Sequence, residues 1–158
     1  HQYLLKLKKE DYLVVSGNGE LSTYEKILSQ IKCKIILDVD GKLLKKLLYI
    51  KPFLVKPNDV ELEEISKDIE EAYHILLKDA EYILHTKGRN GACLISKERR
   101  YTVNGQKVQA ISTVGCGDAA LAGFLAYYLQ GNSLKECLDF SNQCGLYRAE
   151  FGQFLIQN

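Results

Sequence analysis

Short apolar runs alternate with helical stripes along the first half of the chain. The runs at residues 11–16, 34–38, 53–56 and 82–86 are rich in Ile, Leu and Val and predict buried strands. Between them, apolar residues recur at helical spacing in residues 20–32, 43–48, 59–66 and 70–77. Strands separated by helices of this length require crossover connections, so the pattern predicts a mostly parallel sheet covered by helices on both faces.

The pattern changes after residue 86. Short apolar runs at residues 92–96, 101–103 and 108–111 are joined by residues 97–100 and by Asn104-Gly105, which predicts antiparallel strands. Two helices are expected to follow. The first, at residues 119–130, ends at Gly131, and Ser133 with Glu136 forms a capping box that opens the second. Without a repeat or a linker, residues 1–158 are interpreted as one α/β domain.

Composition restricts the partners and the compartment. With 46% hydrophobic and 26% charged residues and a net charge of +1, the chain has no global field favouring nucleic acid or an anionic membrane. Five cysteines without a CxxC pair argue against a secreted disulfide framework. No apolar run approaches the ~20 residues of a membrane span. We therefore expect a soluble cytoplasmic protein that binds neither nucleic acid nor membrane.

Ligands of open α/β sheets bind beyond the carboxyl ends of the strands, and the loop at residues 112–118 carries the strongest signal there. Gly115 and Gly117 allow a tight turn and a close backbone approach, because neither has a Cβ. The free amides of the first helical turn and the helix dipole behind them form an anion site. Taken alone, Asp118 in the first helical turn is explained as an ordinary helix cap.

The string from Thr113 to Asp118, followed by the small-residue helix at 119–125, resembles the C-terminal signature of PfkB (ribokinase-like) carbohydrate kinases. It departs at Ser112, usually an acid or amide, and at Cys116, usually alanine. The resemblance implies a ribokinase-like three-layer α/β/α fold with a mostly parallel sheet and an antiparallel edge hairpin. It also implies ATP-dependent phosphoryl transfer, with Asp118 as the base and the amides of Gly115, Cys116, Gly117 and Asp118 as the anion hole.

Two further loops fit the same family. Asn58 and Glu61 form a variant capping box, and they also match the family's Asn-x-x-Glu motif, which is linked to Mg²⁺. Both interpretations can hold together. Lys56, which opens a Lys-Pro-Asn string, resembles the lysine near the nucleotide phosphates in the 1-phosphofructokinase and tagatose-6-phosphate kinase branch. The resemblance thus implies a sugar phosphate as acceptor and Mg²⁺ and ATP as cofactors.

The remaining nucleotide contacts are carried over from the family. Thr86, Gly88 and Gly91 match the Thr/Ser-x-Gly-x-x-Gly loop that cradles the ATP phosphates, and Asn142 lies on the helix beside the adenine pocket. The loop at Asp38 resembles an Asp-x-Ser-Gly string of the same branch but is given no catalytic role. His85, which lacks the paired spacing of a metal site in the sequence, is interpreted as a strand residue.

The resemblance runs from about Asp11 to about Gly145 and covers the second half of the family pattern. The sequence opens with His1 and contains no methionine. We therefore expect a partial domain, the C-terminal nucleotide-binding portion, which is inactive alone. The lid that supplies the sugar contacts, and through which a homodimer could form, lies outside it. The alternatives are a catalytically silent nucleotide-binding or assembly module and a Rossmann domain, which would need a Gly-x-Gly-x-x-Gly string.

Overall fold

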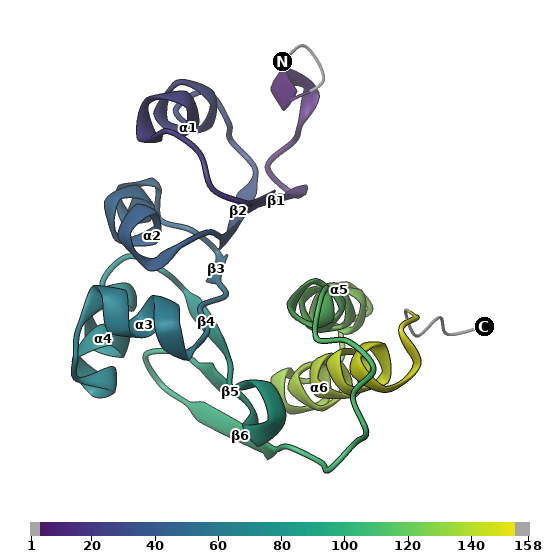
Figure 1. Cartoon of the computed structure of the whole chain (residues 1–158). Coiled ribbons are helices and arrows are strands. Elements are labelled where there is room, and N and C mark those ends of the chain that lie inside the picture. Colours follow the sequence, from purple (N-terminus) through teal and green to yellow (C-terminus); the bar gives the residue numbers. More distant parts are fainter. Residues whose placement is uncertain (1–3, 154–158) are drawn as a thin grey trace. The chain divides into compact units, whose positions relative to one another are not determined.

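The computed structural model describes residues 4–153, and the chain forms two compact units within it (Figure 1). The first unit contains the chain up to His85 together with Ile95–Arg99. The second contains Thr86–Leu94 and the chain from Arg100 onward. The six strands are neighbours in sequence order, β1-β2-β3-β4-β5-β6, in a mostly parallel sheet with antiparallel strands, which confirms the predicted sheet type.

The first unit alternates strands and helices. Its elements are η1 (Leu4–Lys6), β1 (Tyr12–Ser16), α1 (Leu21–Leu28), β2 (Lys34–Asp38), α2 (Gly41–Leu47), η2 (Leu48–Ile50), β3 (Leu54–Val55), α3 (Asp59–Ile65), α4 (Ile69–Leu76) and β4 (Tyr82–Thr86). β1 pairs with β2, β2 with β3, and β3 with β4, all in parallel. The bounds of β2 and β4 are those that the apolar runs predict. Helix α1 and strand β3 are shorter than predicted.

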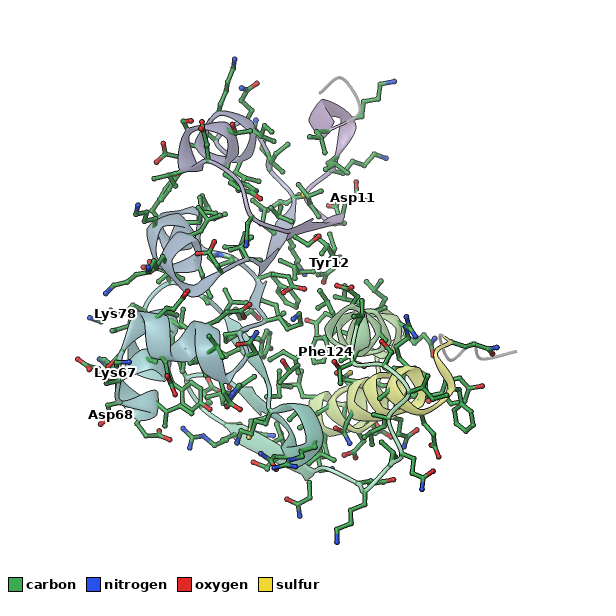
Figure 2. All side chains as sticks on the ribbon, viewed as in Figure 1. Asp11, Tyr12, Lys67, Asp68, Lys78 and Phe124 are labelled. Carbon is green, nitrogen blue, oxygen red and sulfur yellow. The ribbon has the colours of Figure 1, made fainter. Side chains whose placement is uncertain are left out.

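The four helices of this unit lie along one face of β1–β4 (Figure 1). Each strand is added on the same side of the preceding one, and right-handed crossovers then bring every connecting helix to the same face. Their inward positions form a core that includes Ile36, Leu44, Leu54, Leu62 and Leu76, each at most 1% exposed. Lys67, Asp68 and Lys78 project away from the strands at the α3–α4 end (Figure 2).

Short polar side chains begin three of these helices. Asp40 accepts a hydrogen bond from the amide of Leu43, and Asp68 accepts from those of Glu70 and Glu71. Asn58 opens α3. Such N-caps satisfy amides that have no partner inside a helix, and each typically contributes about 1 kcal/mol. The caps fix where the loops at the carboxyl ends of β2 and β3 turn into helices.

The second unit contains most of a hairpin, whose turn at Ile95–Arg99 belongs to the first unit, and two helices. The loop after β4 contains η3 (Gly88–Asn90) and leads into β5 (Gly91–Ile95), which a tight turn joins to β6 (Arg100–Asn104). In that turn the amide of Ser96 donates to the carbonyl of Arg99 at 2.8 Å. Helices α5 (Cys116–Leu129) and α6 (Leu134–Phe151) follow. The predicted capping box of Ser133 and Glu136 is present.

The predicted third hairpin strand at residues 108–111 is wrong. Residues 105–110 form no regular element, and Ile111 is 75% exposed. The amide of Ile111 donates to the carbonyl of Ala149 on α6 at 2.8 Å, so its backbone bonds to a helix end instead of a strand. A second correction concerns α5, which begins at Cys116 and not at Ala119, so the motif residues themselves form its first turn.

Helices α5 and α6 pack closely. A Cβ at Gly123 would lie 2.6 Å from the sulfur of Cys144, so only glycine fits there without displacing that side chain. Ser141 donates its hydroxyl hydrogen to the carbonyl of Ala120 at 2.8 Å, and the rings of Tyr127 and Phe140 stack at 3.9 Å. These contacts hold the amino-terminal turn of α5 on a rigid helix pair. Among residues 4–153 no helix is both long and apolar enough to span a bilayer.

Candidate active site

A buried ion pair lies at the carboxyl ends of β2 and β3. The Lys56 ammonium lies 2.8 Å from a carboxylate oxygen of Asp38, and the two side chains are 7% and 12% exposed. The backbone places them together, because the Lys56 amide donates to the carbonyl of Leu37 at 2.9 Å. Removing two charges from water costs several kcal/mol per ion, so such a pair needs a compensating geometry or role.

The capping box of α3 stands directly after this pair. The amide of Glu61 donates to the Asn58 side chain at 3.0 Å, and the Asn58 amide donates to Glu61 Oε2 at 2.9 Å. Burial raises the pKa of Glu61, while the hydrogen bond from Asn58 and the charge of Lys56 oppose that shift. The structure therefore confirms the cap, and it leaves a half-buried carboxylate whose negative charge lacks full compensation.

The half-buried Glu61 carboxylate is an oxygen ligand of the type that Mg²⁺ takes. In the described part of the chain no group of three or more His, Cys, Asp or Glu side chains could hold a metal. Mg²⁺ is commonly held by one or two carboxylates together with waters and substrate phosphates, so a complete protein cage is not required. The raised pKa of Glu61 means that a nearby cation would stabilise its ionised form. Glu61 is the residue that would hold the ion, and the nearby charge of Asp38 raises the pKa of Glu61 further.

The Gly-x-Gly-Asp turn forms the amino end of α5. Gly115 is the N-cap residue with φ 78° and ψ 3°, a left-handed conformation that favours glycine. Asp118 is the third helical residue and is exposed. Its side chain is not a cap, so the cap interpretation of Asp118 is wrong for this helix. Within residues 4–153, the amides of Gly117 and Asp118 make no turn or cap hydrogen bond, which leaves them available to an anion.

Cys116 and Ser112, the two departures from the family pattern, stabilise this turn. The Ser112 hydroxyl accepts from the amide of Val114 at 3.2 Å. The Cys116 thiol lies 3.7 Å from the Ser112 carbonyl, and burial raises its pKa against the opposing charge of Arg148. The Cys116 amide makes a long 3.3 Å bond to the Thr113 carbonyl, so it is a weaker anion donor than its neighbours.

The loop after β4 has the glycine geometry of a tight turn. The amide of Lys87 donates to the carbonyl of Gly91 at 2.9 Å. Gly91 has φ 97°, and a Cβ there would lie 2.1 Å from the carbonyl oxygen of Val103. The structure thus gives Gly91 a packing role against β6. Gly88 has φ 52° with open space around it, and Thr86 is half-buried at the end of β4.

Comparison with known proteins identifies the family to which these motifs belong. The family model described as pfkB family carbohydrate kinase matches residues 3–149. The chain belongs to this family.

Curated relatives of this pfkB-family chain are kinases of sugar phosphates by name. It is 35% identical over 135 residues to 1-phosphofructokinase of Bacillus subtilis, covering 76% of the chain and 45% of the relative. It is 31% identical over 166 residues to tagatose-6-phosphate kinase of Staphylococcus epidermidis, covering 93% and 54%. The chain spans about half the length of the curated relatives it matches.

Solved structures confirm the ribokinase-like fold. Phosphofructokinase-2 from Escherichia coli, in complex with substrates and products, matches with a TM-score of 0.83 at 24% identity, over 94% of this chain and 54% of that one. A nucleoside kinase of Methanocaldococcus jannaschii, an archaeal member of the ribokinase family, matches with a TM-score of 0.72 at 18% identity, over 89% and 49%. At these identities the likeness supports the fold alone.

The structure gathers the predicted site residues of the first unit and places those of the second unit on separate elements. Lys56, Asn58 and Glu61 gather after β3 in the first unit. Those of the second unit lie in the loop after β4, at the start of α5 and on α6, where Asn142 is 8% exposed. The sequence interpretation missed Asp38, whose partner 18 positions away no local pattern reveals. It also missed the environment of His85, a fully buried side chain with two polar partners.

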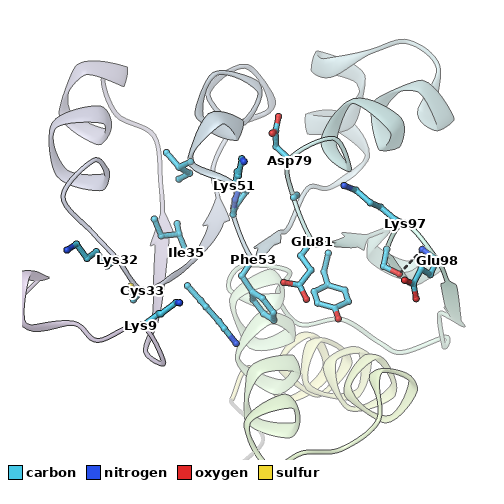
Figure 3. Close-up of a pocket in the computed structure, with 16 residues that line it drawn as sticks. Lys9, Lys32, Cys33, Ile35, Lys51, Phe53, Asp79, Glu81, Lys97 and Glu98 are labelled. Carbon is cyan, nitrogen blue, oxygen red and sulfur yellow. Dashed lines mark hydrogen bonds between the residues drawn. The ribbon is translucent and has the colours of Figure 1, made fainter.

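A cavity of about 620 Å³ lies elsewhere in the first unit (Figure 3). It is at the amino ends of β2, β3 and β4, and its lining includes Lys9, Cys33, Lys51, Phe53 and Asp79. None of the site residues lines it. Ligands of open α/β sheets bind at the opposite, carboxyl ends of the strands, so this cavity has no part in the candidate site.

Proposed function

We propose that the complete protein containing this chain transfers the γ-phosphoryl group of ATP to a hydroxyl of a sugar phosphate. The observation that carries the proposal is the position of Asp118. It is an exposed carboxylate at the third position of α5, in the same turn as the amides of Gly117 and Asp118, which make no turn or cap hydrogen bond within residues 4–153. The family match over residues 3–149 supports the same reaction class.

In this mechanism Asp118 accepts the proton of the acceptor hydroxyl as its oxygen attacks the γ-phosphorus. The bond from that phosphorus to the bridging oxygen of ADP breaks, and ADP leaves. The amides around Gly115–Asp118 and the positive end of the α5 dipole stabilise the charge on the transferred group. The carboxylate thus acts on the acceptor hydroxyl, and the amide donors act on the transferred phosphoryl group.

The proposal assigns the metal and nucleotide contacts as the family motifs suggest. Mg²⁺ would neutralise phosphate charge when it is bound. Glu61 would hold that ion through the carboxylate oxygen that its cap leaves, and Lys56, which pairs with Asp38, would contact the phosphates. Thr86, Gly88 and Gly91 cradle the ATP phosphates, and Asn142 lies beside the adenine.

The acceptor class follows from the relatives. The relatives cited above are named 1-phosphofructokinase and tagatose-6-phosphate kinase. We propose that the complete protein likewise uses a sugar phosphate as its acceptor. We further propose that this chain is its nucleotide-binding portion, is inactive alone, and assembles as a homodimer through a lid supplied by other residues. Size-exclusion chromatography and activity assays of this chain and of the complete protein test these points.

An NMR titration of the protein with Mg²⁺-ATP tests the nucleotide site. The amides of Gly88 and Gly117 are expected to shift. The amides of Gly131 and Gly152 are matched controls, because both glycines also have positive φ but follow the carboxyl ends of α5 and α6. Shifts that spare Gly88 and Gly117 would contradict the proposed site.

A further inference from the structure

Three hydrogen-bonded polar side chains link β4 to two helices of the first unit. His85 on β4 is completely buried. Its Nδ1 lies 2.6 Å from the Tyr73 hydroxyl on α4, and its Nε2 lies 2.8 Å from Asp59 Oδ1 on α3. Ile83 and Leu84, the neighbouring strand residues, are equally buried and apolar. An apolar residue at position 85 would therefore serve packing without the cost of burying an imidazole.

The chemistry of the partners fixes the direction of these bonds. An ionised carboxylate can only accept, so Nε2 carries a hydrogen and donates to Asp59. In the neutral ring Nδ1 then accepts the hydrogen of Tyr73. Tyr73 thus orients the imidazole, and the imidazole in turn holds the Asp59 carboxylate in one orientation.

Asp59 is the first residue of α3 and lies between Asn58 and Glu61, the two residues of the capping box. The same turn is restrained from another side by α2, because a Cβ at Gly41 would lie 2.0 Å from the carbonyl oxygen of Glu61. Close packing against α2 and the bond from His85 therefore act on one helical turn. That turn carries the carboxylate proposed to serve the metal.

We propose that His85 is a positioning residue for Mg²⁺, acting through Asp59 to hold the first turn of α3 and with it the carboxylate of Glu61. The inference rests on the proposed function. Mg²⁺ demands near-ideal octahedral geometry with short bonds, so a small displacement of a carboxylate that holds its water weakens the site. Outer partners that orient metal-binding groups typically change metal affinity by about 10–100-fold when they are lost.

Two amide substitutions separate this role from packing. The amide nitrogen of Gln lies near the place of Nε2, so His85→Gln keeps a donor for Asp59. The shorter amide of Asn lies near the place of Nδ1, so His85→Asn leaves Asp59 without that donor. In the complete protein, His85→Asn is expected to raise the Mg²⁺ concentration for half-maximal rate by roughly 10-fold. His85→Gln should stay within about twofold, and the KM for ATP at saturating Mg²⁺ should change little in both.

Hydrogen exchange of the Glu61 amide gives a readout that does not depend on activity. It should be faster in His85→Asn than in His85→Gln, because that amide is protected by the turn that Asp59 orders. Equal Mg²⁺ requirements in the two variants and the wild type would overturn the proposal. A wild type without Mg²⁺-dependent transfer would instead contradict the proposed function.

A third variant keeps the test decisive if His85→Asn does not fold. Asp59→Ala removes the exposed side chain that accepts the hydrogen bond from His85, and it leaves His85 and Tyr73 in place. It is expected to raise the Mg²⁺ requirement as much as His85→Asn. A folded Asp59→Ala protein with the wild-type requirement would overturn the proposal.

Discussion

The ammonium of Lys56 and the carboxylate of Asp38 lie 2.8 Å apart, and both side chains are almost fully buried. The pair joins two adjacent parallel strands at the edge where the proposed phosphate and metal contacts gather. A hydrophobic pair would fill the same space without desolvating two charges. We therefore interpret the ion pair as an interaction that holds Lys56 in position for its proposed contact with the nucleotide phosphates.

Removing one member of this pair should destabilise the protein strongly. Asp38→Ala leaves a buried ammonium without its counter-ion, and we expect a loss of about 3–5 kcal/mol in the free energy of unfolding. Urea denaturation measures it. The exposed Lys135–Asp139 pair is the matched control, and Lys135→Ala should cost less than about 1 kcal/mol. If Asp38→Ala cost no more than the control, the pair would have no structural role.

The raised pKa of Glu61 predicts a pH-dependent stability. Its folded-state pKa lies above the usual value of about 4.3, so its contribution to stability is complete below that value and is lost as pH rises through the folded pKa. Glu61→Gln does not titrate. Without Mg²⁺, the variant should therefore gain stability relative to the wild type as pH rises. The free energy of unfolding of the variant minus that of the wild type should be larger at about pH 7 than at about pH 4. A difference independent of pH would contradict the raised pKa.

The same substitution separates the metal role of Glu61 from its cap. Gln also serves a capping box, so α3 should persist in Glu61→Gln. In the complete protein the Mg²⁺ concentration for half-maximal rate should rise, measured at saturating ATP. Glu63→Gln, an exposed position on the same helix, should leave it unchanged. An unchanged Mg²⁺ dependence in Glu61→Gln would leave Glu61 with the cap alone.

The two glycines of the loop after β4 should respond differently to alanine. At Gly91 the added methyl would meet the carbonyl oxygen of Val103, so Gly91→Ala is expected to unfold or severely destabilise the protein. At Gly88 the space is open, and the left-handed backbone should cost only about 1–2 kcal/mol. Gly88→Ala should therefore fold and raise the KM for ATP. A wild-type KM would exclude a close phosphate approach at Gly88.

Local sequence patterns predicted much of the fold because local physics decides those features. The bounds of β2 and β4 follow from apolar runs, and the caps at Asn58 and Ser133 follow from side-chain chemistry within three residues. The family string at residues 113–118 located the start of a helix within a few residues. These features need no knowledge of distant contacts.

The wrong strand prediction at residues 108–111, and the polar partners that the sequence did not reveal, both depend on contacts between distant residues. Residues 108–111 have strand propensity, yet the amide of Ile111 bonds to Ala149 on α6, and that contact overrides the local pattern. His85 looked like an ordinary strand residue because Tyr73 and Asp59 lie 12 and 26 positions away. The partner of Asp38, Lys56, likewise lies 18 positions away. Polar networks built across elements carry no periodic signal that a single sequence displays.

The most direct test of the account is kcat of Asp118→Asn in the complete protein. Asparagine keeps the size of the side chain, and the Gly117 and Asp118 amides belong to the backbone, so we expect ATP affinity to change by no more than a few-fold. Loss of a general base typically lowers the rate by about 10²–10⁴-fold, and we predict a decrease in kcat of that size. Glu136→Gln is the matched control, because Glu136 is the acidic third residue of α6, and it should keep wild-type kcat. A folded Asp118→Asn protein, verified by circular dichroism, that retained most of its kcat would contradict the account.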